Sequence, residues 1–89
     1  MKMQEGFVMR EVAGQYVVVA VGEASKTFHG MIKLNSTGKD IWEGLEKGLT
    51  EEEIVEILVE KYDVQNSDVK NDVQEFLKQM REVGIIVNE

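Results

Sequence analysis

The side chains most often used for catalysis and metal binding are scarce in this chain. There is no cysteine, which excludes disulfides, thiolate metal sites and a cysteine nucleophile. The one histidine, His29, excludes every site built from paired histidines and lies in a polar stretch beside Gly30. Ser25, Ser36 and Ser67 belong to no nucleophile motif, and no phosphate-binding loop or dinucleotide fingerprint is present. We therefore expect a protein that is not an enzyme and that uses no metal and no cofactor.

Charge is distributed unevenly along the chain. The net charge is −7 over 89 residues. Residues 1–35 carry four basic and three acidic side chains, whereas residues 36–89 carry six basic and fourteen acidic ones. Because an acidic half of this kind repels phosphate backbones, we expect no nucleic-acid partner.

Hydropathy predicts no membrane segment. The longest apolar run, residues 16–21, is six residues long, whereas a spanning helix needs roughly 20. Residues 1–6 contain one lysine but no apolar core of the kind that marks a secretory signal. We expect a cytoplasmic protein with no membrane partner.

The first third of the chain has the composition of strands. Residues 7–12 and 16–21 are rich in β-branched and aromatic side chains. The turn at 13–15 contains a glycine, so the two segments are predicted to form a hairpin. A polar loop follows over 22–30, and 31–34 is predicted to be a short third strand.

From Asn35 onward the hydrophobic period becomes helical. Asn35 or Ser36 is expected to cap a first helix that ends at Gly48. Thr50 and Glu53 have the spacing of a capping box, which predicts the start of a second helix.

A third helix is expected to open at Asn66 or Ser67 and to end before Gly84. Its apolar side chains recur at helical spacing and are Val69, Val73, Phe76, Leu77, Met80 and Val83. A short apolar tail follows at 85–87. Strands followed by helices predict an α+β fold, with a three-stranded antiparallel sheet and then a three-helix bundle, in a single domain over 1–89.

The segment from Leu34 to Leu45 resembles the signature of the PqqD family. It combines a Leu-Asn pair, small residues, an Ile-Trp pair and a leucine, and it is followed by Gly48 and a capped second helix. Later positions also match the family's spacing, namely Tyr62-Asp63, Asp72-Val73, Phe76-Leu77 and Gly84-Ile85. The resemblance covers about residues 7–87, nearly the whole chain.

This resemblance implies a winged helix-turn-helix-like domain that binds peptide instead of DNA. Members of the family recognise the leader segment of a ribosomally made precursor peptide and present it to a modifying enzyme, commonly a radical S-adenosylmethionine protein. The leader lies antiparallel to the third strand and places apolar side chains in the cleft beside the third helix. The residues that the resemblance assigns to this site are Gly30, Met31, Ile32, Lys33, Leu34, Val69, Asp72, Val73, Phe76 and Met80.

The residues themselves make such a binding mode physically reasonable. A strand at a sheet edge offers unpaired N–H and C=O groups to an incoming chain. Alternation in the third strand places Ile32 and Leu34 on one face and Met31 and Lys33 on the other. Lys33 and Asp72 are expected at the rim of the cleft, where they would select charges on the peptide.

Two other functions are compatible with the sequence. A winged-helix DNA-binding protein has the same order of elements, but the third helix lacks a basic face, since it carries Lys70, Lys78 and Arg81 against Asp68, Asp72, Glu75 and Glu82. A non-catalytic adaptor or dimerisation domain is the other alternative. Both faces of the strand at 16–21 are apolar, which would suit a homodimer.

The apolar stripe of the third helix also has a purely structural explanation. In most small helical domains such a stripe belongs to the core. We expect Leu77 and Trp42 to be core residues in either case.

Overall fold

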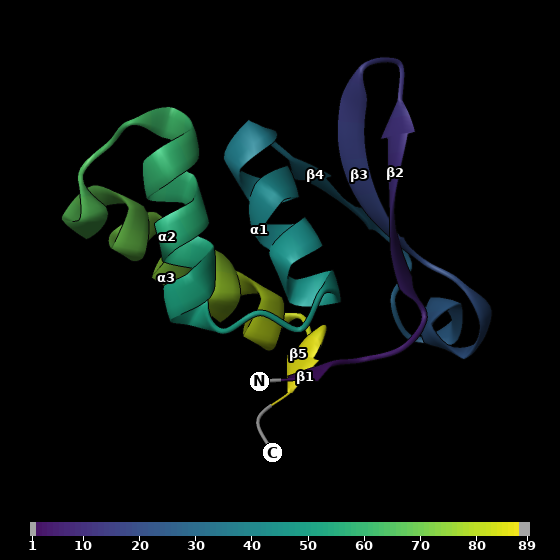
Figure 1. Ribbon diagram of the computed structural model, residues 1–89. Helices are drawn as coiled ribbons and strands as arrows, with labels where there is room; N and C mark the ends of the chain where they lie inside the picture. Colours follow the sequence, from purple (N-terminus) through teal and green to yellow (C-terminus); the bar gives the residue numbers. More distant parts are fainter. Residues whose placement is uncertain (1, 88–89) are drawn as a thin grey trace.

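The computed structural model describes residues 2–87 (Figure 1), so the predicted domain limits at 1 and 89 lie outside the described residues. Its main sheet contains β2 (Phe7–Val12), β3 (Gln15–Ala20) and β4 (Met31–Leu34) in the order β2-β3-β4, all antiparallel. The prediction of a hairpin followed by a third strand is confirmed, with β3 shifted by one residue toward the N-terminus.

Two segments at the ends of the chain form a second, two-stranded sheet that sequence reasoning missed. β1 (Lys2–Met3) pairs antiparallel with β5 (Ile86–Val87). The backbone N–H of Gln4 also donates to the carbonyl of Ile85 at 2.7 Å. Ile85 and Ile86 are buried, so the apolar tail is part of the hydrophobic core.

The segment between β3 and β4 is partly helical. A 3₁₀ helix, η1 (Gly22–Lys26), occupies most of the predicted loop. It packs closely on Gly6, where an added Cβ would lie 2.8 Å from the Cβ of Ala24. Phe28, which follows η1, packs edge-on against Phe7 of β2 with ring centroids 5.5 Å apart.

The three helices are α1 (Ser36–Glu46), α2 (Glu51–Tyr62) and α3 (Asn66–Glu82). Asn35 caps α1, and the capping box at the start of α2 is present as predicted. Gly84 follows α3 with a φ of +83°, a conformation that favours glycine. α3 begins at Asn66, as predicted, and its N-cap residue is Gln65, whose side chain makes no capping hydrogen bond.

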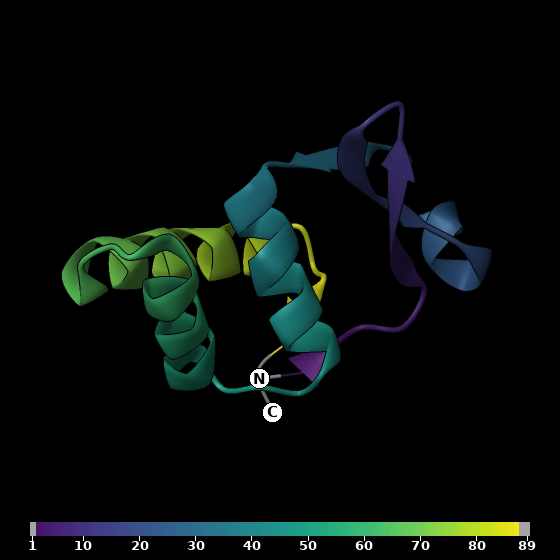
Figure 2. The same ribbon diagram turned by 45° about the horizontal axis from the view of Figure 1, so that its top comes forward.

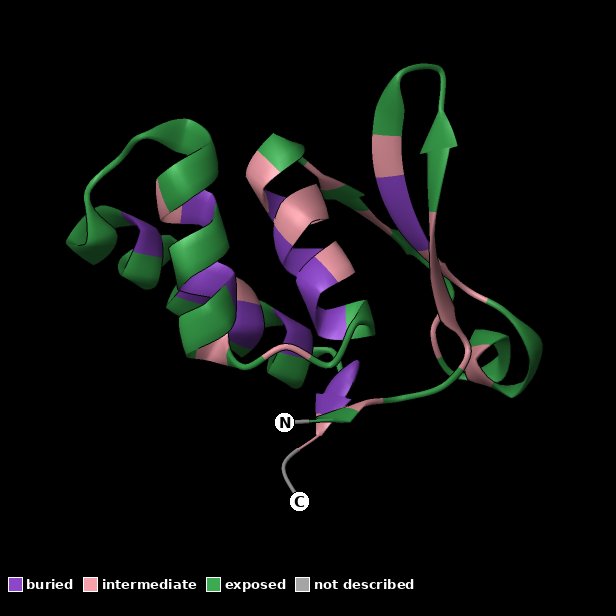
Figure 3. Cartoon of the chain, viewed as in Figure 1, coloured by how far each residue is buried: buried purple, intermediate pink, exposed green. Residues whose placement is uncertain are grey.

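α1 lies between the sheet and the other two helices (Figures 1 and 2). Each of the three helices carries buried residues among exposed ones (Figure 3). The core includes Trp42 and Leu77, as expected, together with Val18 of β3 and Ile54 and Leu58 of α2. In the part of the chain that the structure describes, no helix has the length and apolarity to cross a membrane.

Candidate functional site

β4 has a free edge. Among residues 2–87 it pairs with β3 alone, in a register that places Ile32 opposite Val18 and Lys33 opposite Val17. In an antiparallel pair, successive residues alternate between backbone groups that face the neighbouring strand and groups that face away. Two of the four residues of β4 therefore direct their N–H and C=O groups outward, where a further strand can pair with them.

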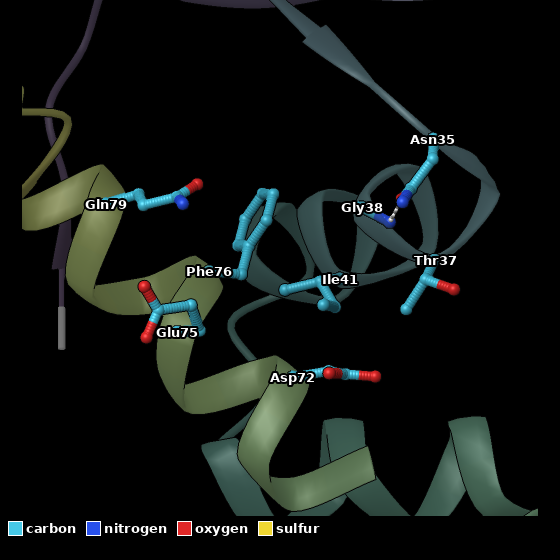
Figure 4. A pocket seen from close by; sticks show the side chains of 8 residues that line it. All are labelled: Asn35, Thr37, Gly38, Ile41, Asp72, Glu75, Phe76 and Gln79. Atoms are coloured by element: carbon cyan, nitrogen blue, oxygen red, sulfur yellow. Dashed lines mark hydrogen bonds between the residues drawn. The ribbon is translucent and has the colours of Figure 1, made fainter. Parts of the chain in front are cut away.

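A hollow lies beside this edge, between the start of α1 and the middle of α3 (Figure 4). Its volume is about 260 Å³. We call it the first hollow, and its lining residues are Asn35, Thr37, Gly38, Ile41, Asp72, Glu75, Phe76 and Gln79. The ring of Phe76 stands between the two helices, facing Ile41 and Gly38.

Gly38 keeps the first hollow open. A Cβ at this position would lie 3.3 Å from Cε2 of Phe76 and 3.4 Å from Cβ of Leu34. The glycine therefore brings the ring from α3 and the last side chain of β4 to the same point. The backbone N–H of Gly38 donates to Oδ1 of Asn35 at 2.7 Å, which fixes the turn from β4 into α1.

The structure places the predicted strand residues along the free edge. Ile32 and Leu34 are half-buried and pack against the core, whereas Met31 and Lys33 are exposed on the opposite face. Met31 has 60% of its surface exposed. Gly30 is exposed and directly precedes the strand.

The predicted residues of α3 divide into two groups. Asp72 and Phe76 line the first hollow. Val73 and Met80 are 0% and 2% exposed, and Val69 is buried as well, because this side of α3 packs against the core. Val73 and Met80 therefore offer almost no surface to a peptide in this arrangement, and they belong to the core cluster against which Phe76 packs.

Sequence reasoning did not assign six residues that line the first hollow, namely Asn35, Thr37, Gly38, Ile41, Glu75 and Gln79. The sequence indicates Asn35 as a candidate helix cap and gives Gly38 no role in the site. A glycine in the first turn of a helix was the available signal, because a missing side chain inside a helix often marks a close approach.

A second hollow continues from the first. Its volume is about 240 Å³, and its lining residues are Thr37, Leu58, Tyr62, Val64, Asp68, Val69 and Asp72. Thr37 and Asp72 line both hollows. The two hollows are therefore neighbours, which follow one another from the start of α1 to the junction between α2 and α3, and together we call them the groove.

A hydrogen-bonded cluster lies behind the second hollow. Asp40 of α1 accepts hydrogen bonds from Nζ of Lys61, at 2.9 Å, and from the hydroxyl of Tyr62. Burial alone would raise the pKa of Asp40, but the hydrogen bonds from Tyr62 and Lys61 together outweigh it and hold that pKa below its usual value. The same bond to Asp40 raises the pKa of the Tyr62 hydroxyl.

The groove is acidic. Asp68, Asp72 and Glu75 contribute carboxylates, and no lysine or arginine lines either hollow. Such a lining repels a phosphate backbone, which disfavours the DNA-binding alternative. Within residues 2–87, no cluster of histidine and carboxylate side chains is suited to hold a metal ion.

The outer face of the main sheet bears on the dimerisation alternative. Met31 and Val12 are exposed there, beside the basic side chains of Arg10 and Lys33. This face is partly apolar, but two cations on it would repel their counterparts in a symmetric pair. A homodimer therefore stays a prediction.

A family model matches nearly the whole chain. The model of the family described as coenzyme PQQ synthesis protein D (PqqD) matches residues 8–86. No curated protein matches the chain in sequence.

Two solved structures share the fold. One is TbiB1 in complex with the TbiA(beta) leader peptide, with a TM-score of 0.81 and 24% identity, over 100% of this chain and 98% of that one. The other is a lasso peptide synthetase B1 complexed with the leader peptide, with a TM-score of 0.78 and 16% identity, over 98% of this chain and 96% of that one.

Proposed function

This chain belongs to the PqqD family, and we propose that it binds the leader segment of a ribosomally synthesised precursor peptide as an additional strand along β4. It then presents the precursor to a modifying enzyme. The two solved structures compared above are complexes with leader peptides. The observation that carries the proposal in this chain is the free edge of β4 beside the first hollow.

Strand addition divides the work of binding between backbone and side chains. Main-chain hydrogen bonds to β4 supply affinity with little demand on sequence, each contributing roughly 0.5–1.5 kcal/mol net. Alternate peptide side chains point to the same side as Ile32 and Leu34 and enter the first hollow against Phe76. The remaining side chains lie beside Met31 and Lys33 on the outer face.

The role we propose is that of a non-catalytic adaptor. This chain recognises the precursor peptide, and the partner enzyme carries out the chemical modification. We expect the partner to be a radical S-adenosylmethionine protein or another peptide-modifying enzyme. Because a single added strand buries a small interface, below about 1,200 Å², we expect binding to be reversible so that the precursor can be passed on.

The direct test measures backbone protection along β4. The probes are the short peptides encoded beside the gene, added to the intact chain and followed by amide hydrogen exchange. A bound leader should slow exchange at two alternating amides within 31–34, because only the outward-facing N–H groups gain partners. A peptide that binds without protecting any of these amides would refute strand addition.

A backbone variant provides the second arm of the test. Lys33→Pro removes the N–H of residue 33 and should abolish binding if that amide faces outward. If it faces β3 instead, the same substitution should lower the melting temperature, because it breaks the β3–β4 ladder. Lys33→Ala, which keeps the amide, is the matched control and should retain most of the affinity.

A further inference from the structure

We infer that the leader peptide carries a lysine or arginine on the N-terminal side of the segment that pairs with β4, and that this side chain occupies the second hollow. This inference rests on the proposed function, including the antiparallel direction of the peptide. It assigns a specific chemistry to a part of the groove that backbone pairing with β4 does not reach.

The path of the groove determines which end of the peptide reaches the second hollow. β4 runs from Met31 to Leu34 and leads directly into α1. An antiparallel peptide therefore has its N-terminal end near Leu34. Beyond Leu34 the groove continues through the residues that both hollows share, Thr37 and Asp72, into the second hollow.

The second hollow has an apolar floor and an acidic rim. Leu58 and Val69 are buried side chains that line it. Asp68 and Asp72, one helical turn apart on α3, contribute exposed carboxylates. Lysine and arginine match this combination, because an aliphatic stem can pack on the floor while the cationic end stays at the rim.

Between residues 2 and 87, no lysine or arginine forms an ion pair with the carboxylates of the groove. The ion pairs in the described part of the chain join Lys26 to Glu23, Lys39 to Glu43 and Lys61 to Asp40, and none of them involves Asp68, Asp72 or Glu75. Lys61 is the cation closest in sequence to the α2 side of the hollow, and it is held by Asp40 at 2.9 Å.

Lys70 of α3 is also directed elsewhere. It lines a separate hollow together with Glu51, Glu52 and Glu56 of α2. A cationic side chain of the ligand would therefore complement Asp68 and Asp72, beside which no lysine or arginine lines the second hollow. An acidic peptide side chain would be repelled there, and a purely apolar one would cover carboxylates without pairing them.

The first experiment selects ligands without assuming their sequence. An mRNA-displayed library of random linear peptides is enriched on the intact chain, and the enriched peptides are aligned on the segment that protects the amides of 31–34. We expect lysine or arginine to be enriched on the N-terminal side of that segment. If the enriched peptides protect the amides of 31–34 but show no preference for lysine or arginine, the inference is overturned and strand addition stands. If no peptide is enriched above blank resin, both the inference and the proposed function are overturned.

The second experiment measures one enriched peptide and its counterpart with the basic residue changed to glutamine. Against the wild-type chain, the glutamine peptide should bind about three- to tenfold more weakly. Asp72→Asn should remove most of this difference. Glu82→Gln makes the same change in net charge at an exposed residue of α3 outside both hollows, and it should preserve the difference.

The matched variants separate a local pair from a general effect of charge. Equal losses for Asp72→Asn and Glu82→Gln would show that the peptide responds only to net charge, and would overturn the assignment of the second hollow. Thermal melting of both variants establishes that each is folded in the assay.

Discussion

The two glycines of α1 mark two regions that are built from similar parts but differ in packing. Around Gly44, α1 meets α2 so closely that an added Cβ would lie 2.8 Å from Cγ1 of Ile54. Around Gly38, six residues earlier, α1 faces α3 and β4, and an added Cβ would lie 3.3 Å from the ring of Phe76. The first region is part of the closed core, and the second borders the groove.

The difference shows how one helix can serve stability and recognition at the same time. Ile54 is 2% exposed and is surrounded by other core residues. Phe76 is only half-buried, with one side against the core and the other in the first hollow. Substitutions near Gly44 should therefore change stability, whereas substitutions near Gly38 should mainly change binding.

The largest effect is expected in the closed region. Ile54→Ala should lower the free energy of unfolding by about 2–5 kcal/mol, because it removes buried methyl groups and leaves a cavity beside Gly44. Urea titration at low temperature measures this change. The affinity of the folded protein for the peptide should be unchanged. A large loss of affinity in the folded fraction would contradict the division between a region that sets stability and a region that binds peptide.

The next effect concerns the groove. Phe76→Ala should weaken leader binding by about 1–3 kcal/mol, because the ring forms the wall of the first hollow. Fluorescence anisotropy with a labelled leader peptide measures the affinity.

The neighbouring residue provides the control for that experiment. Leu77 is 1% exposed and faces the core, so Leu77→Ala should reduce stability more than Phe76→Ala and affinity less. The reverse ranking would place Phe76 in the core and Leu77 in the site.

The closed region was largely predictable from sequence. Periodic apolar residues identify the faces of the helices, and local chemistry identifies their starts at Asn35 and Thr50. The pairing of β1 with β5 was missed because each strand has only two residues and the contact joins opposite ends of the chain. No local pattern records such a contact.

The open region was predicted less completely. The edge strand and Phe76 follow from the family resemblance, whereas burial separates the other helix residues, since Val69 lines the second hollow but Val73 and Met80 are 0% and 2% exposed. Helical spacing shows which residues share a face but does not show where the core ends and a groove begins. That boundary depends on how closely α1 approaches α3. The missing side chain of Gly38 allows this close approach.

The two glycines allow a direct comparison of smaller effects. Alanine raises helix propensity by up to about 1 kcal/mol at either position. Gly44→Ala should nevertheless destabilise the chain by about 1 kcal/mol, because the buried Ile54 side chain must move. Gly38→Ala should leave stability nearly unchanged and reduce peptide affinity, since the methyl group enters the space between Phe76 and Leu34. Melting and binding curves for both variants test this, and equal losses of stability would contradict it.

The smallest effect should come from Asp40, which connects α1 to the end of α2 behind the second hollow. Its pKa is lowered in the folded chain from an ordinary value near 3.8, since the hydrogen bonds from Tyr62 and Lys61 outweigh the effect of burial. A lowered pKa means that the unfolded chain binds the proton more readily. The contribution of Asp40 to stability is therefore fully present above its unfolded pKa and is lost as the pH falls through the lower folded value.

Asp40→Asn should cost less than about 1 kcal/mol at neutral pH. It should also flatten this part of the pH dependence of stability, as measured by thermal melting. Parallel pH profiles for the wild type and Asp40→Asn would show that this carboxylate contributes nothing to the acid dependence of stability.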